Sequence, residues 1–253
     1  MQIHPTAIVK DGARLGDGCI VNAYAHISRH CELGEKVVVH PFAVVGGDPQ
    51  DLSFDPAVES GVQVGARTII REHVTISRAT RPGDYTRVGP DCFLMAGCHV
   101  AHDCQIGASV VIANAVLLAG HVQVGERAFL GGGAVVHQFC RIGEGAMIGG
   151  GARISADVPP FCMATERNAL IGLNIVGLRR RGFGRPVVAE LKRALHALNQ
   201  PVGNPRRIAA ELLAGSQYKT PEGQRFLAFC ASGKRHLVRQ RRSGAEDLGE
   251  ADV

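Results

Sequence analysis

The chain has 253 residues, of which 45% are hydrophobic, with 32 glycines, three tyrosines and no tryptophan. This composition suits many tight turns around a thin aliphatic core, and the length allows one large domain with an appendage. No apolar stretch is long enough to span a bilayer, and the N-terminus lacks the layout of a signal peptide. We therefore expect a cytoplasmic protein without stable membrane insertion.

The net charge of +5 is unevenly distributed. Residues 1–177 hold 13 basic and 16 acidic residues, whereas residues 178–242 hold 15 basic and 3 acidic ones, a local excess of +12 (15 − 3). The basic surface is thus C-terminal, which favours an acidic macromolecular partner.

Aliphatic residues recur every six positions through most of the chain. The runs are Ile3 to Val45, Val64 to Ile76, and Val88 to Ile154. An α-helix, a coiled coil and a single strand all have other periods. We predict an all-β main body over residues 1–160, a left-handed parallel β-helix in which three hexads form each 18-residue coil and successive coils stack about 4.8 Å apart.

A second inward position follows each aliphatic residue by four and takes small side chains. Six of the eight cysteines occupy it: Cys19, Cys31, Cys92, Cys98, Cys104 and Cys140. No CxxC pair occurs, so we interpret these cysteines as buried hydrophobes, and we expect no disulfide and no metal site.

Two interruptions break the repeat after residues in the same phase of the coil. The next aliphatic position after Val45 is Val64, 19 residues further on, and Pro82 stands where an aliphatic residue is expected between Ile76 and Val88. Irregular segments on a rigid scaffold often carry function. We expect the residues in this phase to stack as one column along the prism, whose members are Val45, Val64, Pro82, Val100, Leu118 and Val136.

The repeat ends near Pro159 and Pro160, because proline cannot donate to a strand ladder. A helical region over residues 161–242 follows, with helices expected at 186–199, 205–215 and 220–231, each with proline at or near its start. Residues 243–253 are acidic, and we expect a disordered tail there.

Four histidines follow the phase of the column: His99, His102, His121 and His137. They should gather near one edge over three coils, about 10 Å of height. His102 with Asp103 beside it is the best general base, and no serine or inward-facing cysteine is placed to act as a nucleophile. Gly120 follows His102 by 18 residues, so its N–H should approach a developing oxyanion.

Longer motifs carry a family likeness. These are PQDL at 49–52, GCHVAHDC at 97–104, LAGHV at 118–122, VHQF at 136–139, DVPP at 157–160 and GLNIVGLRRRGF at 172–183. Together they closely resemble the UDP-N-acetylglucosamine O-acyltransferases that begin lipid A biosynthesis.

The resemblance implies a homotrimer with active sites between neighbouring prisms, acyl carrier protein as the donor of a 3-hydroxyacyl group, a UDP-amino sugar as acceptor, no cofactor and no nucleic-acid partner. It implies His102 as the general base, Asp103 as its orienting partner and Gly120 as the oxyanion donor. It implies Gly150 as the acyl-chain ruler, and glycine there predicts a longer acyl chain. The implied substrate-binding residues are Gln50, Asp51, Met95, His99, His121, His137, Gln138, Asn174, Arg180 and Arg181.

Several alternatives stay open. Ser53 and Val176 depart from the family pattern, which leaves room for a sugar N-acyltransferase that acts on a 3-amino UDP-sugar. An acyl-CoA donor would indicate another sugar acyltransferase. A zinc γ-type carbonic anhydrase shares the solenoid but needs three metal ligands with an open fourth position. A non-catalytic solenoid would tolerate loss of His102.

Overall fold

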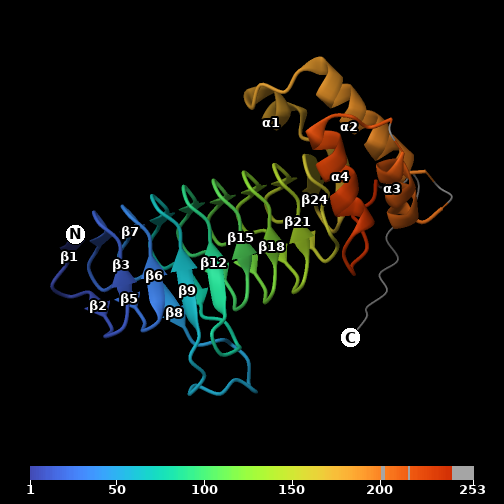
Figure 1. Ribbon diagram of the computed structural model, residues 1–253. Helices are drawn as coiled ribbons and strands as arrows, with labels where there is room; N and C mark the ends of the chain where they lie inside the picture. Colours follow the sequence, from blue (N-terminus) through green and yellow to red (C-terminus); the bar gives the residue numbers. More distant parts are fainter. Residues whose placement is uncertain (201–202, 216, 241–253) are drawn as a thin grey trace.

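A computed structural model describes residues 1–200, 203–215 and 217–240 and shows a three-sided parallel β-helix capped by helices (Figure 1). The first side, sheet A, contains β1 (Gln2–Ile3), β4 (Ile20–Val21), β7 (Val38–Val39), β10 (Ile69–Ile70), β13 (Phe93–Leu94), β16 (Val111–Ile112), β19 (Phe129–Leu130), β22 (Met147–Ile148), β24 (Cys162–Thr165) and β25 (Ala169–Leu173).

Sheet B contains β2 (Ile8–Val9), β5 (His26–Ile27), β8 (Val44–Gly47), β11 (Thr75–Ser77), β14 (His99–Val100), β17 (Leu117–Leu118), β20 (Val135–Val136) and β23 (Arg153–Ile154). Sheet C contains β3 (Arg14–Leu15), β6 (Cys31–Leu33), β9 (Gly61–Val64), β12 (Tyr85–Val88), β15 (Gln105–Ile106), β18 (Gln123–Val124) and β21 (Arg141–Ile142). The predicted left-handed β-helix is confirmed.

The second residue of most strands points inward, which explains the period of six. Val100, for example, pairs in register with Leu118, which pairs with Val136, and none of the three is more than 2% exposed. The small-residue positions are also buried, and all eight cysteines are free and buried. Glycines that follow sheet C permit close contact between coils, since a Cβ on Gly107 would lie 2.7 Å from the Glu126 nitrogen.

The structure corrects the predicted column. Val64 belongs to sheet C and Pro82 lies in a loop, so the residue stacked between Val45 and Val100 is Ile76. The sequence argument misplaced these two residues because it counted the residues of each loop as positions of the coil. Both interruptions still follow sheet B, and their loops project together from the prism (Figure 1), where the Gly83 N–H donates to the Glu59 carbonyl.

The strands continue beyond the two prolines. Val158 still bridges to Ile142, and β24 and β25 extend sheet A to Leu173. The predicted helical region 161–242 therefore begins with two strands. Its helices are α1 (Ile175–Arg180), which the sequence argument missed, and α2 (Arg185–Leu198), α3 (Pro205–Ala214) and α4 (Pro221–Ala231), which match the three predicted ones.

The helices pack on one another over the end of the β-helix (Figure 1). Thr220 caps α4 by accepting the Gly223 N–H, and proline follows it at the first helical position. No described helix has the length and apolar character needed to cross a membrane. The predicted acidic tail, residues 243–253, lies outside the described residues.

Candidate active site

The histidine cluster lies where sheet B turns into sheet C. His99 is on β14, His102 follows that strand, and His121 and His137 follow β17 and β20. Because β14, β17 and β20 are consecutive strands of one sheet, the four side chains lie on three successive coils, with His99 and His102 on the same one. The rings of His102 and His121 meet edge to face, with centroids 5.2 Å apart. Residues far apart in the sequence therefore form one cluster.

His102 and Asp103 form a hydrogen-bonded pair, with 2.8 Å between the His102 Nδ1 and the Asp103 Oδ2. Thr80 donates to the same carboxylate through its hydroxyl, at 2.8 Å, and through its backbone N–H, at 3.2 Å. The Thr86 hydroxyl accepts the Asp103 N–H at 2.8 Å. Thr80 thus holds the carboxylate and Thr86 of β12 holds the Asp103 backbone, so the carboxylate can orient the imidazole.

The electrostatics of the pair favour an ionised carboxylate. Burial acts to raise the pKa of Asp103, but the hydrogen bonds from His102 and Thr80 outweigh it, so the pKa lies below its ordinary value. An ionised Asp103 accepts the Nδ1 proton of His102 and leaves the Nε2 lone pair free to take a proton. This is the arrangement that a general base needs.

Gly120 lies against the His102 ring. A Cβ on Gly120 would come within 2.5 Å of the His102 Cε1 and 2.7 Å of its Nε2, so only glycine fits beside the imidazole. Among the described residues, no carbonyl accepts the Gly120 N–H, whereas the neighbouring Ala119 and His121 N–H groups are both bonded. An unbonded amide next to a base can donate to an oxyanion.

His121 approaches the same carboxylate, with 3.6 Å between its Nε2 and the Asp103 Oδ2, and its ring stacks on Phe139. The ligand atoms of His102, Asp103 and His121 lie within 4.8 Å of one another, close enough to hold a metal ion. The hydrogen bond between His102 and Asp103 gives these two groups a role as base and orienting partner that needs no metal ion.

His99 and His137 have their own partners. The Thr75 hydroxyl lies 2.7 Å from the His99 Nδ1. Burial lowers the pKa of His99, and the neighbouring His102 lowers it further, so His99 is neutral near pH 7. The His137 Nδ1 lies 3.0 Å from the Arg235 guanidinium.

Three of the four histidines, His99, His102 and His137, line a groove of about 930 Å³, whereas His121 is not among its lining residues. Its floor is largely apolar, and its polar lining is Gln50, Thr75, His99, His102, His137, Gln138, Arg153, Ser155 and Arg167. A groove of 1010 Å³ follows sheet C, and none of the described residues that line it is a histidine. We therefore place the chemistry in the groove along sheet B.

Gln50 enters the groove from the first loop, which Arg78 holds in place. The Arg78 guanidinium bonds the Asp48 carboxylate and the Pro56 and Val58 carbonyls. Asp51 is exposed nearby, and the Ser53 N–H and hydroxyl, which donate to it, lower its pKa.

Met95 and Gly150 follow β13 and β22, at the corner between sheets A and B, so they flank sheet B on the side opposite the dyad. A Cβ on Gly150 would meet its nearest atom, the backbone oxygen of Gly132, at 3.3 Å, so a side chain there would be in tight contact with the neighbouring coil. Neither residue lines the histidine groove within one chain.

Three further residues that the resemblance implies for substrate binding, Asn174, Arg180 and Arg181, lie at another corner of the prism. Asn174 caps α1 and donates to the Gly145 carbonyl at 3.3 Å, beside the corner that follows sheet C. Arg181 pairs with Glu144 at 2.5 Å, and its guanidinium lies over two phenylalanine rings. Arg180 is exposed, and no described residue pairs with it.

Sequence reasoning missed four residues of this site: Thr75, Thr80, Thr86 and Arg235. The interruption after Ile76 was the only signal for the threonines, since it marked an irregular segment next to the histidine column. No local signal pointed to Arg235, which lies 98 residues from His137.

The repeated coils and the histidine corner define a transferase of the hexapeptide-repeat class. A profile described as "Bacterial transferase hexapeptide (six repeats)" matches residues 12–47, 85–120 and 121–156. A second profile, "Udp N-acetylglucosamine O-acyltransferase; Domain 2", matches residues 157–238, so both parts of the chain find counterparts.

Relatives narrow the class to one family. The acyl-[acyl-carrier-protein]--UDP-N-acetylglucosamine O-acyltransferase of Thermodesulfovibrio yellowstonii is 42% identical over 94% of this chain and 92% of its own length, and that of Syntrophobacter fumaroxidans is 40% identical over 94% and 100%. The solved UDP-N-acetylglucosamine acyltransferase from Campylobacter jejuni superposes with a TM-score of 0.83 at 35% identity, over 95% and 100% of the two chains. The chain belongs to the UDP-N-acetylglucosamine O-acyltransferase family.

Proposed function

We propose that this protein transfers a 3-hydroxyacyl group from acyl carrier protein to the 3-hydroxyl of UDP-N-acetylglucosamine, with His102 as general base. The observation that carries the mechanism is the His102–Asp103 pair beside the unbonded Gly120 amide in one groove. The names of relatives 40 and 42% identical to the chain support the reaction class.

The chemical step follows from these groups. The His102 Nε2 takes the proton of the sugar hydroxyl as its oxygen attacks the thioester carbon. The carbonyl oxygen gains negative charge, and the Gly120 N–H donates to it. When the intermediate collapses, the carbon–sulfur bond breaks and the imidazolium returns its proton to the leaving thiolate. This step needs no acyl-enzyme: the cysteines are buried, and the Ser155 hydroxyl in the groove accepts from the Asn168 amide, with no histidine among the described residues hydrogen-bonded to it as a base.

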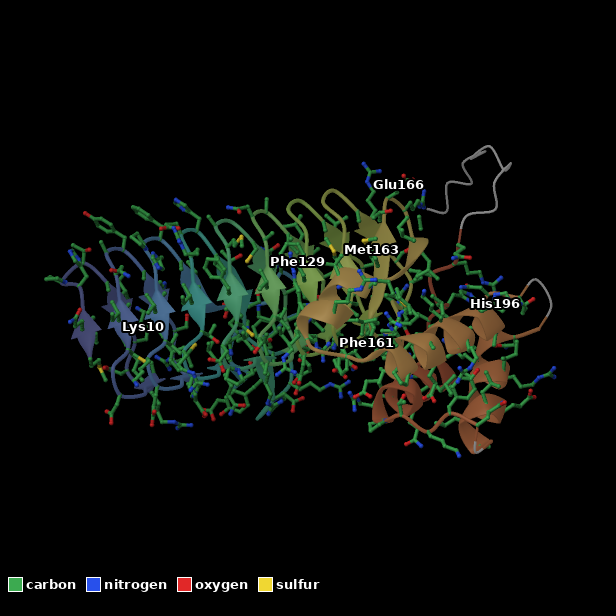
Figure 2. The ribbon with its side chains drawn as sticks, turned by 90° about the horizontal axis from the view of Figure 1, so that it is seen from above. Lys10, Phe129, Phe161, Met163, Glu166 and His196 are labelled. Carbon is green, nitrogen blue, oxygen red and sulfur yellow. The ribbon has the colours of Figure 1, made fainter. Side chains whose placement is uncertain are left out.

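We also propose a homotrimer. At the outward position in register with Ile20, every strand of sheet A from β4 to β24 carries an apolar residue, whereas the outward position in register with Arg14 is polar in every strand of sheet C. This face consists of Ile20, Val38, Ile69, Phe93, Val111, Phe129, Met147 and Met163, of which Phe129 and Met163 are labelled in Figure 2. An apolar stripe over eight strands is typical of a protein interface.

A second observation supports assembly. Asn174 and Arg181 lie beside the corner after sheet C, whereas His102 follows sheet B. Residues on two corners of one prism cannot line one groove, so the joint site implied by the resemblance needs a neighbouring subunit. Phe129→Glu, which puts a charge on the apolar face, should dissociate the oligomer in sedimentation experiments. A wild-type oligomer in this variant would contradict sheet A as the interface.

Acyl carrier protein is the proposed donor, and the basic residues between 178 and 242 suit an acidic partner by electrostatic steering. The cytoplasmic location stays a prediction.

The decisive experiment compares 3-hydroxyacyl carrier protein with the matching acyl-CoA, each with UDP-N-acetylglucosamine and its 3-amino analogue. We expect the carrier-protein donor and the hydroxyl acceptor to give the highest kcat/KM.

A substitution tests the general base. His102→Ala should lower kcat by about 10²–10⁴-fold, as expected when a general base is removed. His4→Ala, in the first coil, is the matched control and should keep full activity. Preference for acyl-CoA or for the amino acceptor would replace this proposal with a related sugar acyltransferase, and zinc-dependent CO₂ hydration would replace it with a carbonic anhydrase.

A further inference from the structure

The segment between Arg235 and Arg239 is bound along the end of the β-helix. Asp157 donates its N–H to the His236 carbonyl at 2.7 Å and accepts the Val238 N–H at 2.9 Å. The Leu170 N–H donates to the Arg239 carbonyl at 2.9 Å. These backbone bonds fix the segment on the strands, so Arg235 at its start has a defined position.

Arg235 reaches the catalytic groove from this segment. Its Nη2 lies 3.0 Å from the His137 Nδ1, and its Nη1 donates to the Ser155 carbonyl at 2.9 Å. Arg206 of α3 donates to the Arg235 carbonyl. His137 and Ser155 both line the groove that contains His102. The helical region therefore places one of its side chains on a residue of the site.

The chemistry of the contact determines where the His137 proton is. A guanidinium is permanently protonated and has no acceptor atom, so it can only donate. The His137 Nδ1 must then present its lone pair to Arg235. The Gln138 carbonyl is 3.2 Å from the same nitrogen, farther than Arg235, and it cannot bond a nitrogen that has no proton. A neutral His137 therefore has its proton on Nε2.

We infer that Arg235 is a positioning residue that fixes His137 as an Nε2–H donor to an oxygen of the bound sugar nucleotide. The inference deepens the proposed function, on which it rests for the presence of the sugar nucleotide in this groove. The acceptor is an oxygen of the sugar or its diphosphate, because a neutral N–H donor suits both.

The test uses the full-length protein. Arg235→Met keeps an unbranched side chain in place of the aliphatic part of arginine and removes the guanidinium donors. We expect KM for UDP-N-acetylglucosamine to rise about tenfold while kcat changes less, as for the loss of one hydrogen bond to substrate. Arg235→Lys, which also only donates, should recover much of that loss. Arg239→Met, in the same segment, is the matched control and should match wild type in KM and in melting temperature.

A double-mutant cycle separates positioning from a general structural effect. His137→Gln keeps a donor but has no tautomers, so adding Arg235→Met to it should raise KM no further. The same tenfold rise in both backgrounds would overturn the inference.

NMR of the protein with ¹⁵N-labelled histidine, assigned with His137→Gln, gives a readout that does not depend on activity. We expect an Nε2–H tautomer for His137 in the wild type and a mixture in Arg235→Met. A wild-type His137 that carries its proton on Nδ1, or on both nitrogens at pH 7.5, would overturn the inference. If no acyl transfer is measurable, the proposed function fails, and this spectrum still decides the role of Arg235.

Discussion

Replacing Gly120 with alanine tests the geometry of the dyad most directly. The added methyl carbon would lie 2.5 Å from the His102 Cε1, whereas carbon atoms in contact are separated by roughly 3.5 Å, so the ring must shift by about 1 Å. The φ angle of Gly120 is not positive, so alanine adds no backbone strain there. A misplacement of about 1 Å at a reacting group costs roughly 10²-fold in rate.

We therefore expect Gly120→Ala to lower kcat about 10²-fold in an assay of acyl transfer from acyl carrier protein. The amide remains in the variant, so the loss reports on the position of His102. Gly184→Ala, where the nearest atom to the new methyl group is 3.5 Å away, should leave kcat near wild type. A Gly120→Ala enzyme that retains more than a third of the wild-type kcat would show that the tight packing of the imidazole is not needed for catalysis.

Three further outcomes are expected. Asp103→Asn should lower kcat by two to four orders of magnitude, because the amide oxygen would accept the Thr80 N–H and leave the NH2 group, which only donates, facing the His102 Nδ1. Unchanged kcat would exclude the dyad. Burial raises the pKa of the Cys31, Cys98 and Cys104 thiols to about 12, so about one in 10⁴ of each is ionised at pH 8. The native protein should therefore not react with a disulfide reagent at these thiols until it is unfolded. Rapid labelling would show that they are accessible. Gly150→Met should shift donor preference toward shorter acyl chains, because the resemblance implies that the acyl chain passes this corner and a long side chain after β22 would take up room beside it. An identical kcat/KM profile across a donor-length series would remove Gly150 as the ruler.

Where the repeat is regular, the sequence predicted position as well as fold. A coil of 18 residues converts an offset in sequence into one step along the prism, so Gly120 could be placed against His102 by counting. The same regularity identified the inward aliphatic residues and explained the cysteines as buried. Strand pairing in a solenoid is between neighbours in sequence, which makes this inference local.

Only the tertiary structure could decide the contacts that cross an interruption or join the two regions. Thr80 reaches Asp103 from a loop whose length obeys no period, and the same loop led to the misplacement of Pro82. Arg235 meets His137 because the last described segment binds along the end of the β-helix. Such contacts depend on how loops and the C-terminal region pack against the β-helix, and the spacing of residues in the sequence does not predict that packing. The repeat therefore determined the scaffold and the corner that holds the histidines, and packing decided which side chains orient them.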